Sequence, residues 1–288
     1  MGQMQTFALT PGRINKFKGQ ILKHAVPVEV LAKGGRQVKF PKNNSDTYVA
    51  RRWVPYGATT TNPNQFFANA TGDRATTMVN AHLTQEGVTV LPESITPMDV
   101  SVVMHQYSCL YGFSDKTYDL YEDDIPQAMQ EQIGERVALV NEMIVYGVVK
   151  ASTNQYYGGT GTSRSTVNGK LTLPLIRKIV KALQANHGAS VTRVLSASNN
   201  YGTDAVSSGF IVYCHTDLEP DIRDLPGFTP VEKYASGTPM ANEAGKCERF
   251  RFVTSPDLPS YQDAGAAIGT TGLYSTTGTS LDVYPLVI

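Results

Sequence analysis

The stretch at residues 156–170, YYGGTGTSRSTVNGK, comes closest in its residue types to a phosphate-binding loop. Such a loop follows a strand, opens a helix and reads G-x-x-x-x-G-K-[ST]. Here the G-K pair is followed by Leu171, Arg164 stands where the first glycine belongs, and the preceding segment has helical periodicity. The dinucleotide pattern G-x-G-x-x-G is also missing. We therefore interpret residues 158–170 as a linker between two packed pieces.

The other residues whose types could support catalysis or metal binding are better explained by structural roles. Cys214, His215 and Asp217 are the densest group of metal-binding types, but neighbours on a strand point to opposite faces and do not easily share an ion. A buried strand cysteine beside a strand-end histidine fits better. Three acids, residues 122–124, could form an acid/base or metal pair, yet they precede a helix whose N-terminus favours negative charge. With no G-x-S-x-G, HExxH or CxxC pattern, we predict no catalytic, cofactor or metal site and no enzyme activity.

Composition bounds the function further. The 288 residues carry no net charge and only 17% charged side chains, against about 25% in a typical protein. A neutral chain has no overall basic field for nucleic acid, and many neutral polar residues suit a surface covered by neighbours. Three cysteines without a paired spacing indicate a reducing compartment, and neither a signal peptide nor a membrane span is expected.

Periodicity predicts the elements that position these residues. A short helix is expected from Thr10-Pro11 to Pro27. Period-two segments are expected at 38–40 and, through TYVARRWVPY, at 48–56, joined by a KNNSD hairpin turn. Strands are expected again within 79–92 and 98–115. The Thr/Asn-rich stretch 57–81 has few apolar anchors, so we expect an arm that finds its partners on another subunit.

The second half of the chain alternates between helices and strands. Apolar residues at steps of three and four predict a helix over 124–151, buried in its second half. A second helix is expected over 172–187, with Thr172 as its N-cap and Gly188 after its end. GFIVYCH, residues 209–215, reads as a buried strand and the segment after it as a short helix. In KCERFRFVTSP the strand faces separate two phenylalanines, Phe250 and Phe252, from two arginines, Arg249 and Arg251.

Several phrases, in this order, resemble the major capsid proteins of tailed bacteriophages. They are HAVPVEVLAKGGRQVKFPK, YVARRWVPY, QYSCLYGFSD, the long helix, VYCHTDLEPDIRDLPGFTPVEKYA and NEAGKCERFRFVTSP. The resemblance covers roughly residues 15–260 and is strongest to the family related to the capsid protein of the short-tailed coliphage N-four. One departure is the apolar ending LDVYPLVI, since relatives usually continue. We therefore expect either a short member or a sequence that stops before the natural C-terminus.

The resemblance implies an α+β chain with the Hong Kong 97-type capsid fold. Its parts would be an N-terminal arm, an extended β-hairpin loop, a peripheral domain with a spine helix at 124–151 beside a long β-sheet, a linker and a mixed α/β axial domain. A last segment would return towards the peripheral domain. The N-terminal arm would be residues 1–35, the extended loop 36–100 and the peripheral domain 101–157. The linker would be residues 158–170, the axial domain 171–260 and the returning segment 261–288.

The resemblance also implies the function and the partners. The expected role is a major capsid protein of the virion, made and assembled in the host cytoplasm. Its partners would be copies of itself in pentamers and hexamers, decoration, scaffolding and portal proteins, and non-specifically packaged double-stranded DNA. Two alternatives stay open, a cellular nanocompartment shell on the same fold and an intracellular α/β hydrolase or transferase. We also expect two groups of subunit-interface residues. The basic-aromatic group on the loop is Arg51, Arg52 and Trp53, and the acids expected to meet it on a neighbouring subunit are Glu122, Asp123 and Asp124.

Overall fold

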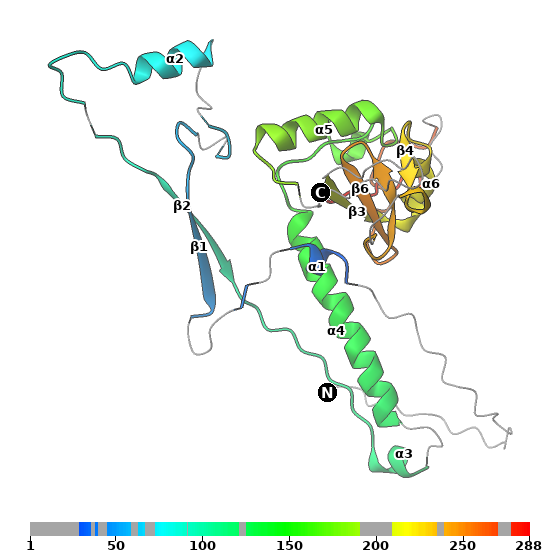
Figure 1. Ribbon diagram of the computed structural model, residues 1–288. Helices are drawn as coiled ribbons and strands as arrows, with labels where there is room; N and C mark the ends of the chain where they lie inside the picture. Colours follow the sequence, from blue (N-terminus) through cyan, green and yellow to red (C-terminus); the bar gives the residue numbers. More distant parts are fainter. Residues whose placement is uncertain are drawn as a thin grey trace, which may run out of the picture.

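The computed structural model (Figure 1) describes residues 29–35, 38–39, 45–58, 63–66, 73–90, 92–120, 125–190, 209–234, 239–269 and 278–288. Over these residues the chain is a mixed α+β protein with one long helix and two small sheets, in agreement with the predicted α+β class. We call residues 45–104 the arm and the described residues from 156 onward the compact part. Figure 1 shows the arm standing apart from the larger sheet. No helix in the described ranges has the length and apolarity needed to cross a membrane.

The arm is a two-stranded antiparallel ribbon with a helix beyond it. Strand β1 (Thr47–Trp53) pairs with β2 (Pro97–Val103), with Thr47 opposite Val103 and Trp53 opposite Pro97. Helix α2 (Arg74–Ala81) follows Asp73, whose carboxylate accepts a hydrogen bond from the Ala75 N–H at 3.1 Å. This cap satisfies one of the free amides that every helix N-terminus exposes.

Three elements predicted between residues 10 and 92 can be compared with the described residues. The strand expected within 79–92 is wrong, because α2 occupies its start and residues 83–90 form no strand. The expected KNNSD hairpin falls mostly on residues outside the described ranges, and the pairing that the structure shows for β1 is a seven-residue register with β2. The helix expected from Thr10 to Pro27 lies outside the described residues.

Two helices follow the arm. Helix α3 (Asp115–Leu120) is short, and α4 (Ile125–Val149) is the predicted long helix, about 37 Å at 1.5 Å per residue. The expectation that its second half is buried is met on one side only, where Glu142 and Tyr146 are buried. Val137 and Val148 are 58% and 73% exposed, because only one side of α4 meets the short helix α1 (Leu31–Gly34) and the compact part. The other side of α4 carries an apolar surface with no cover in the described chain.

The compact part is built on a four-stranded sheet in the order β3-β6-β5-β4. β3 and β6 run parallel, and the other neighbours are antiparallel. The strands are β3 (Phe210–His215), β4 (Phe228–Pro230), β5 (Glu243–Cys247) and β6 (Phe250–Ser255). The helical elements are η1 (Arg164–Thr166), α5 (Leu173–Ala185), η2 (Thr216–Leu218), α6 (Glu219–Arg223) and η3 (Val231–Lys233). The predicted α5, β3, α6 and β6 are thus all present.

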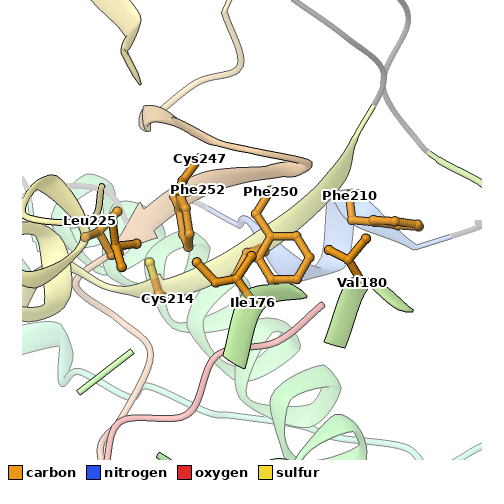
Figure 2. Close-up of a cluster of buried hydrophobic side chains, with 10 residues drawn as sticks. Ile176, Val180, Phe210, Cys214, Leu225, Cys247, Phe250 and Phe252 are labelled. Carbon is orange, nitrogen blue, oxygen red and sulfur yellow. The ribbon is translucent and has the colours of Figure 1, made fainter. Parts of the chain in front are cut away.

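Alternating residues of the central strands build a core on each face of this sheet. On one face, α5 places Ile176 and Val180 against Phe210, Phe250 and Phe252 (Figure 2). On the other face, a second cluster joins the sheet to α4 and to the segment at α1. Its members are Val30, Leu31, Tyr146, Ile211, Tyr213, Val253 and Leu258. Arg251 also lies on this second face, so the predicted separation of Phe250 and Phe252 from Arg251 is confirmed.

The segment at residues 156–170 folds into a compact loop. Gly158 approaches Gly169 so closely that a Cβ atom at Gly158 would lie 2.3 Å from the Gly169 carbonyl oxygen. The Arg164 guanidinium lies 3.8 Å from the centre of the Tyr261 ring. The glycines thus allow two backbone strands to touch, which explains their density without a bound phosphate.

The outer edge of β3 is closed by the end of the chain. Tyr213 and Val287 exchange two backbone hydrogen bonds of 2.8 and 2.9 Å in an antiparallel bridge. Because unpaired strand edges are sites of aggregation, this bridge protects the sheet as well as stabilising it.

Replacing Val287 with proline tests the bridge. Proline removes the N–H donor, so Val287→Pro should lower the free energy of unfolding by about 1–3 kcal/mol more than the matched Val287→Ala. Urea denaturation followed by far-UV circular dichroism measures the difference. Equal effects of the two substitutions would mean that only side-chain packing matters at this edge.

Candidate subunit-contact surfaces

The register of the ribbon gives it two different faces, since directly opposed residues share a face. We call one the apolar ribbon face; it carries no acid, and Arg52 is its one charged residue. Its other members are Tyr48, Ala50, Met98, Val100 and Val102. Val100 is 48% and Val102 54% exposed. The opposite face is mixed, because it holds an ion pair between Arg51 and Asp99.

Exposed apolar side chains gather on the arm and the helices after it. Of the large hydrophobic residues exposed in the described chain, all but Met240, Ile268 and Ile288 lie between Val38 and Tyr156. A two-stranded ribbon alone is marginally stable in water, and large contiguous apolar patches on soluble proteins mark interaction sites. The arm therefore has the composition of a surface that another protein surface covers.

Arg51 is engaged within its own ribbon. Its Nε and Nη2 donate to Asp99 Oδ1 and Oδ2 at 2.7 and 2.8 Å. The side-chain hydrogen bond from Arg51 lowers the pKa of Asp99, and the same bond raises the pKa of Arg51. Arg52, on the other face, donates to the Pro63 carbonyl at 3.4 Å. Both arginines are solvent-exposed, so these contacts orient the side chains more than they stabilise the fold.

Of the remaining interface candidates, the structure describes only Trp53. Trp53 is 62% exposed at the end of β1, as a contact residue would be. The acids at 122–124 lie outside the described residues, so their pairing with Arg51 and Arg52 of a neighbour stays a prediction.

A buried glutamate, which the sequence reasoning missed, attaches the N-terminal segment to the long helix. Glu142 is 2% exposed. Its carboxylate accepts three backbone N–H bonds at the start of α1, from Val30, Leu31 and Ala32 at 3.3, 2.8 and 3.2 Å. Charge-assisted bonds of this kind are about twice as strong as neutral ones. The sequence did contain a signal for this buried role, because Glu142 is the one acid inside the apolar run VALVNEMIVYGVV.

Glu142→Ala should therefore lower the free energy of unfolding by about 3 kcal/mol, because three amides lose their acceptor. Glu142→Gln keeps one oxygen and the side-chain volume, so its effect should be clearly smaller. Thermal and urea unfolding of the two variants gives the comparison. An equal loss in both would assign the effect to the charge alone.

A buried ion pair lies on the sheet. Arg251 Nε donates to Glu243 Oε1 at 2.7 Å, and their side chains are 7% and 0% exposed. The Tyr234 hydroxyl and the Met240 N–H also donate to Glu243, both at 2.9 Å. Burial raises the pKa of Tyr234, and the bond to Glu243 adds to the shift. The pair is satisfied on all sides and has a structural role.

The Cys214–His215–Asp217 group is also structural. Cys214 is fully buried, and burial raises the pKa of its thiol to about 12. The His215 Nδ1 accepts the Asp217 N–H at 3.0 Å, and the Tyr284 hydroxyl donates to Asp217 Oδ2 at 2.9 Å. A buried cysteine beside a strand-end histidine is thus what the structure shows. Nowhere in the described ranges do three histidine, cysteine or acidic side chains gather as a metal site.

The comparisons with known proteins bear on these surfaces. No protein-family model matches the sequence. The chain is 21% identical over 173 residues to the major capsid protein of Pseudomonas phage KPP21. The match covers 55% of this chain and 44% of that protein, so the chain spans less than half the length of the relative. By sequence, this chain with its exposed apolar arm is a distant relative of a phage major capsid protein.

Proposed function

We propose that the chain is a major capsid protein that self-assembles into an icosahedral shell enclosing double-stranded DNA. The observation that carries the proposal is the distant similarity to a phage major capsid protein. The exposed apolar arm and the half-covered α4 support it, since both present surface that further copies of the chain could bury. Many repeated interfaces of moderate size would supply the free energy of assembly.

For the fold, we propose the Hong Kong 97-type arrangement. The ribbon β1-β2 would belong to the extended loop 36–100, α4 would be the spine helix of the peripheral domain 101–157, and residues 171–260 would form the axial domain. The element order supports this assignment, because a long exposed ribbon, a long helix and a compact α/β part follow one another in the described chain. Residues 1–35 would be the N-terminal arm and 261–288 the returning segment.

The direct test is to express the chain and examine it by negative-stain electron microscopy and sedimentation velocity. Closed particles of uniform diameter are expected. DNA that resists nuclease inside particles formed in cells would favour a capsid over a nanocompartment. A protein that stays a monomer of 31.3 kDa under every assembly condition would contradict the proposal.

Charge reversal tests the proposed pairing of the arm arginines with acids of a neighbouring subunit. Arg52→Glu should reduce particle yield strongly, because no acid in its own ribbon is bonded to Arg52. Arg51→Glu has a second effect, since it also places a negative charge against Asp99. Arg52→Gln is the matched control and should assemble at an intermediate level. Yield is measured by size-exclusion chromatography, and full yield from Arg52→Glu would contradict the pairing.

A further inference from the structure

The arm touches the compact part at a small contact near the end of α5. Gln65 Nε2 donates to Asn186 Oδ1 at 3.3 Å. The Phe66 and His187 rings meet edge to face, with centroids 5.1 Å apart and an interplanar angle of 88°. We call residues 63–66 the turn, and Asn186 with His187 the seat. Turn and seat are separated by about 120 residues in sequence, so the contact fixes where the arm lies relative to the compact part.

The backbone of the seat is fixed by the helix end and needs nothing from the arm. The Asn186 N–H bonds to Ala182 O at 3.1 Å and the Gly188 N–H to Leu183 O at 2.8 Å. Between them His187 adopts the left-handed conformation, with φ at 56°. This is the usual way in which a helix satisfies its last carbonyl groups. The backbone of the seat therefore does not depend on the turn.

The contact itself is weak. Phe66 is 58% exposed even when docked, and the hydrogen bond joins two neutral amides. A single exposed aromatic pair with one amide bond favours the docked state by about tenfold. A contact of this strength holds the arm in one position most of the time, yet opens readily when a competing surface is offered.

We propose that turn and seat form an intramolecular latch that holds the arm on its own subunit until assembly opens it. The role in assembly rests on the proposed function; the latch itself does not. While the turn occupies the seat, the apolar ribbon face is tethered to its own compact part. An arm so held has fewer orientations in which that face can meet another copy, so opening precedes growth of the shell.

The first measurement detects the latch in the free subunit by NMR. The chain has five histidines, so selective 13C labelling of their rings gives a simple spectrum. His187→Asn assigns the His187 signal without backbone strain, because asparagine tolerates positive φ. Phe66→Ala should move that signal by removing the ring current. Phe113→Ala, an exposed aromatic outside the contact, should leave it unchanged.

The second measurement follows assembly by light scattering. Phe66→Ala and His187→Asn should each raise the initial rate by roughly three- to tenfold, since each opens the latch. Ile268→Ala, which removes an exposed apolar side chain of the compact part outside both the contact and the apolar arm surface, should assemble at the native rate. The double variant should be no faster than the faster single variant, because one latch can be opened only once.

Each outcome decides one point. If the His187 signal does not move in Phe66→Ala, the latch is overturned. A His187 signal in the native protein that shifts on dilution also overturns it, because the contact would then join two copies. Native rates in both latch variants overturn its role in assembly. If the shift is present but the native protein forms no particles, the latch stands as a structural contact while the capsid function and the assembly role both fail.

Discussion

Val100→Asp combined with Val102→Asp should abolish particle formation while the subunit stays folded. The two valines are about half exposed on the apolar ribbon face, so two charges there cost the free subunit about 1 kcal/mol in total. If that face is covered in the shell, the same charges become buried without partners, at several kcal/mol for each subunit. Sedimentation velocity should show only free subunits.

The matched control places two charges on exposed apolar residues of the compact part. Met240→Asp with Ile268→Asp also replaces two partly exposed apolar side chains, and neither lies on the arm or on the helices after it, so particles should still form. Circular dichroism and urea unfolding confirm that both double variants are folded. Normal particles from the Val100 and Val102 variant would show that the apolar ribbon face is not buried between subunits.

The largest effect on stability is expected at Phe252. Its side chain is fully buried, meets Phe250 edge to face with centroids 6.3 Å apart, and lies in the core beneath α5 (Figure 2). Phe252→Ala should lower the free energy of unfolding by about 3–5 kcal/mol, because it removes a full aromatic side chain and leaves a cavity. Urea denaturation monitored by far-UV circular dichroism measures the loss.

Phe113→Ala serves as the control for Phe252. Phe113 is 43% exposed and precedes α3, so its removal should change the unfolding free energy by no more than about 1 kcal/mol. Comparable losses from the two substitutions would mean that the sheet core under α5 is not the main source of stability. Because the compact part contains this core, Phe252→Ala should also reduce particle yield at elevated temperature.

Elements whose signals are local were predictable from the sequence. The apolar steps of three and four over 125–149 predicted α4, and Thr172, Pro174 and Gly188 bracketed α5. The strand β3 was identified as a buried strand from the apolar run GFIVYCH. In each case the residues that decide the structure lie within one or two turns of one another, so no partner has to be known.

The candidate contact surface was only partly predictable. Arg51, Arg52 and Trp53 were identified as contact residues from their types, but their faces depend on the pairing of β1 with a strand 44 residues further along the chain. That register puts Arg51 beside Asp99 and gathers Val100 and Val102 on the other side. A shift of one residue would exchange the two faces, so the surface exists only once the register is set.

Sequence alone determined the mixture of helices and strands, the long helix and the alternation of apolar and polar positions, because these follow from the spacing of neighbouring side chains. The tertiary structure decided which strand completes the arm, that Glu142 holds three amides over a hundred residues away, and that Val287 closes β3. Those contacts join segments distant in the chain. Their free energy depends on atoms that meet only after folding, which no local pattern encodes.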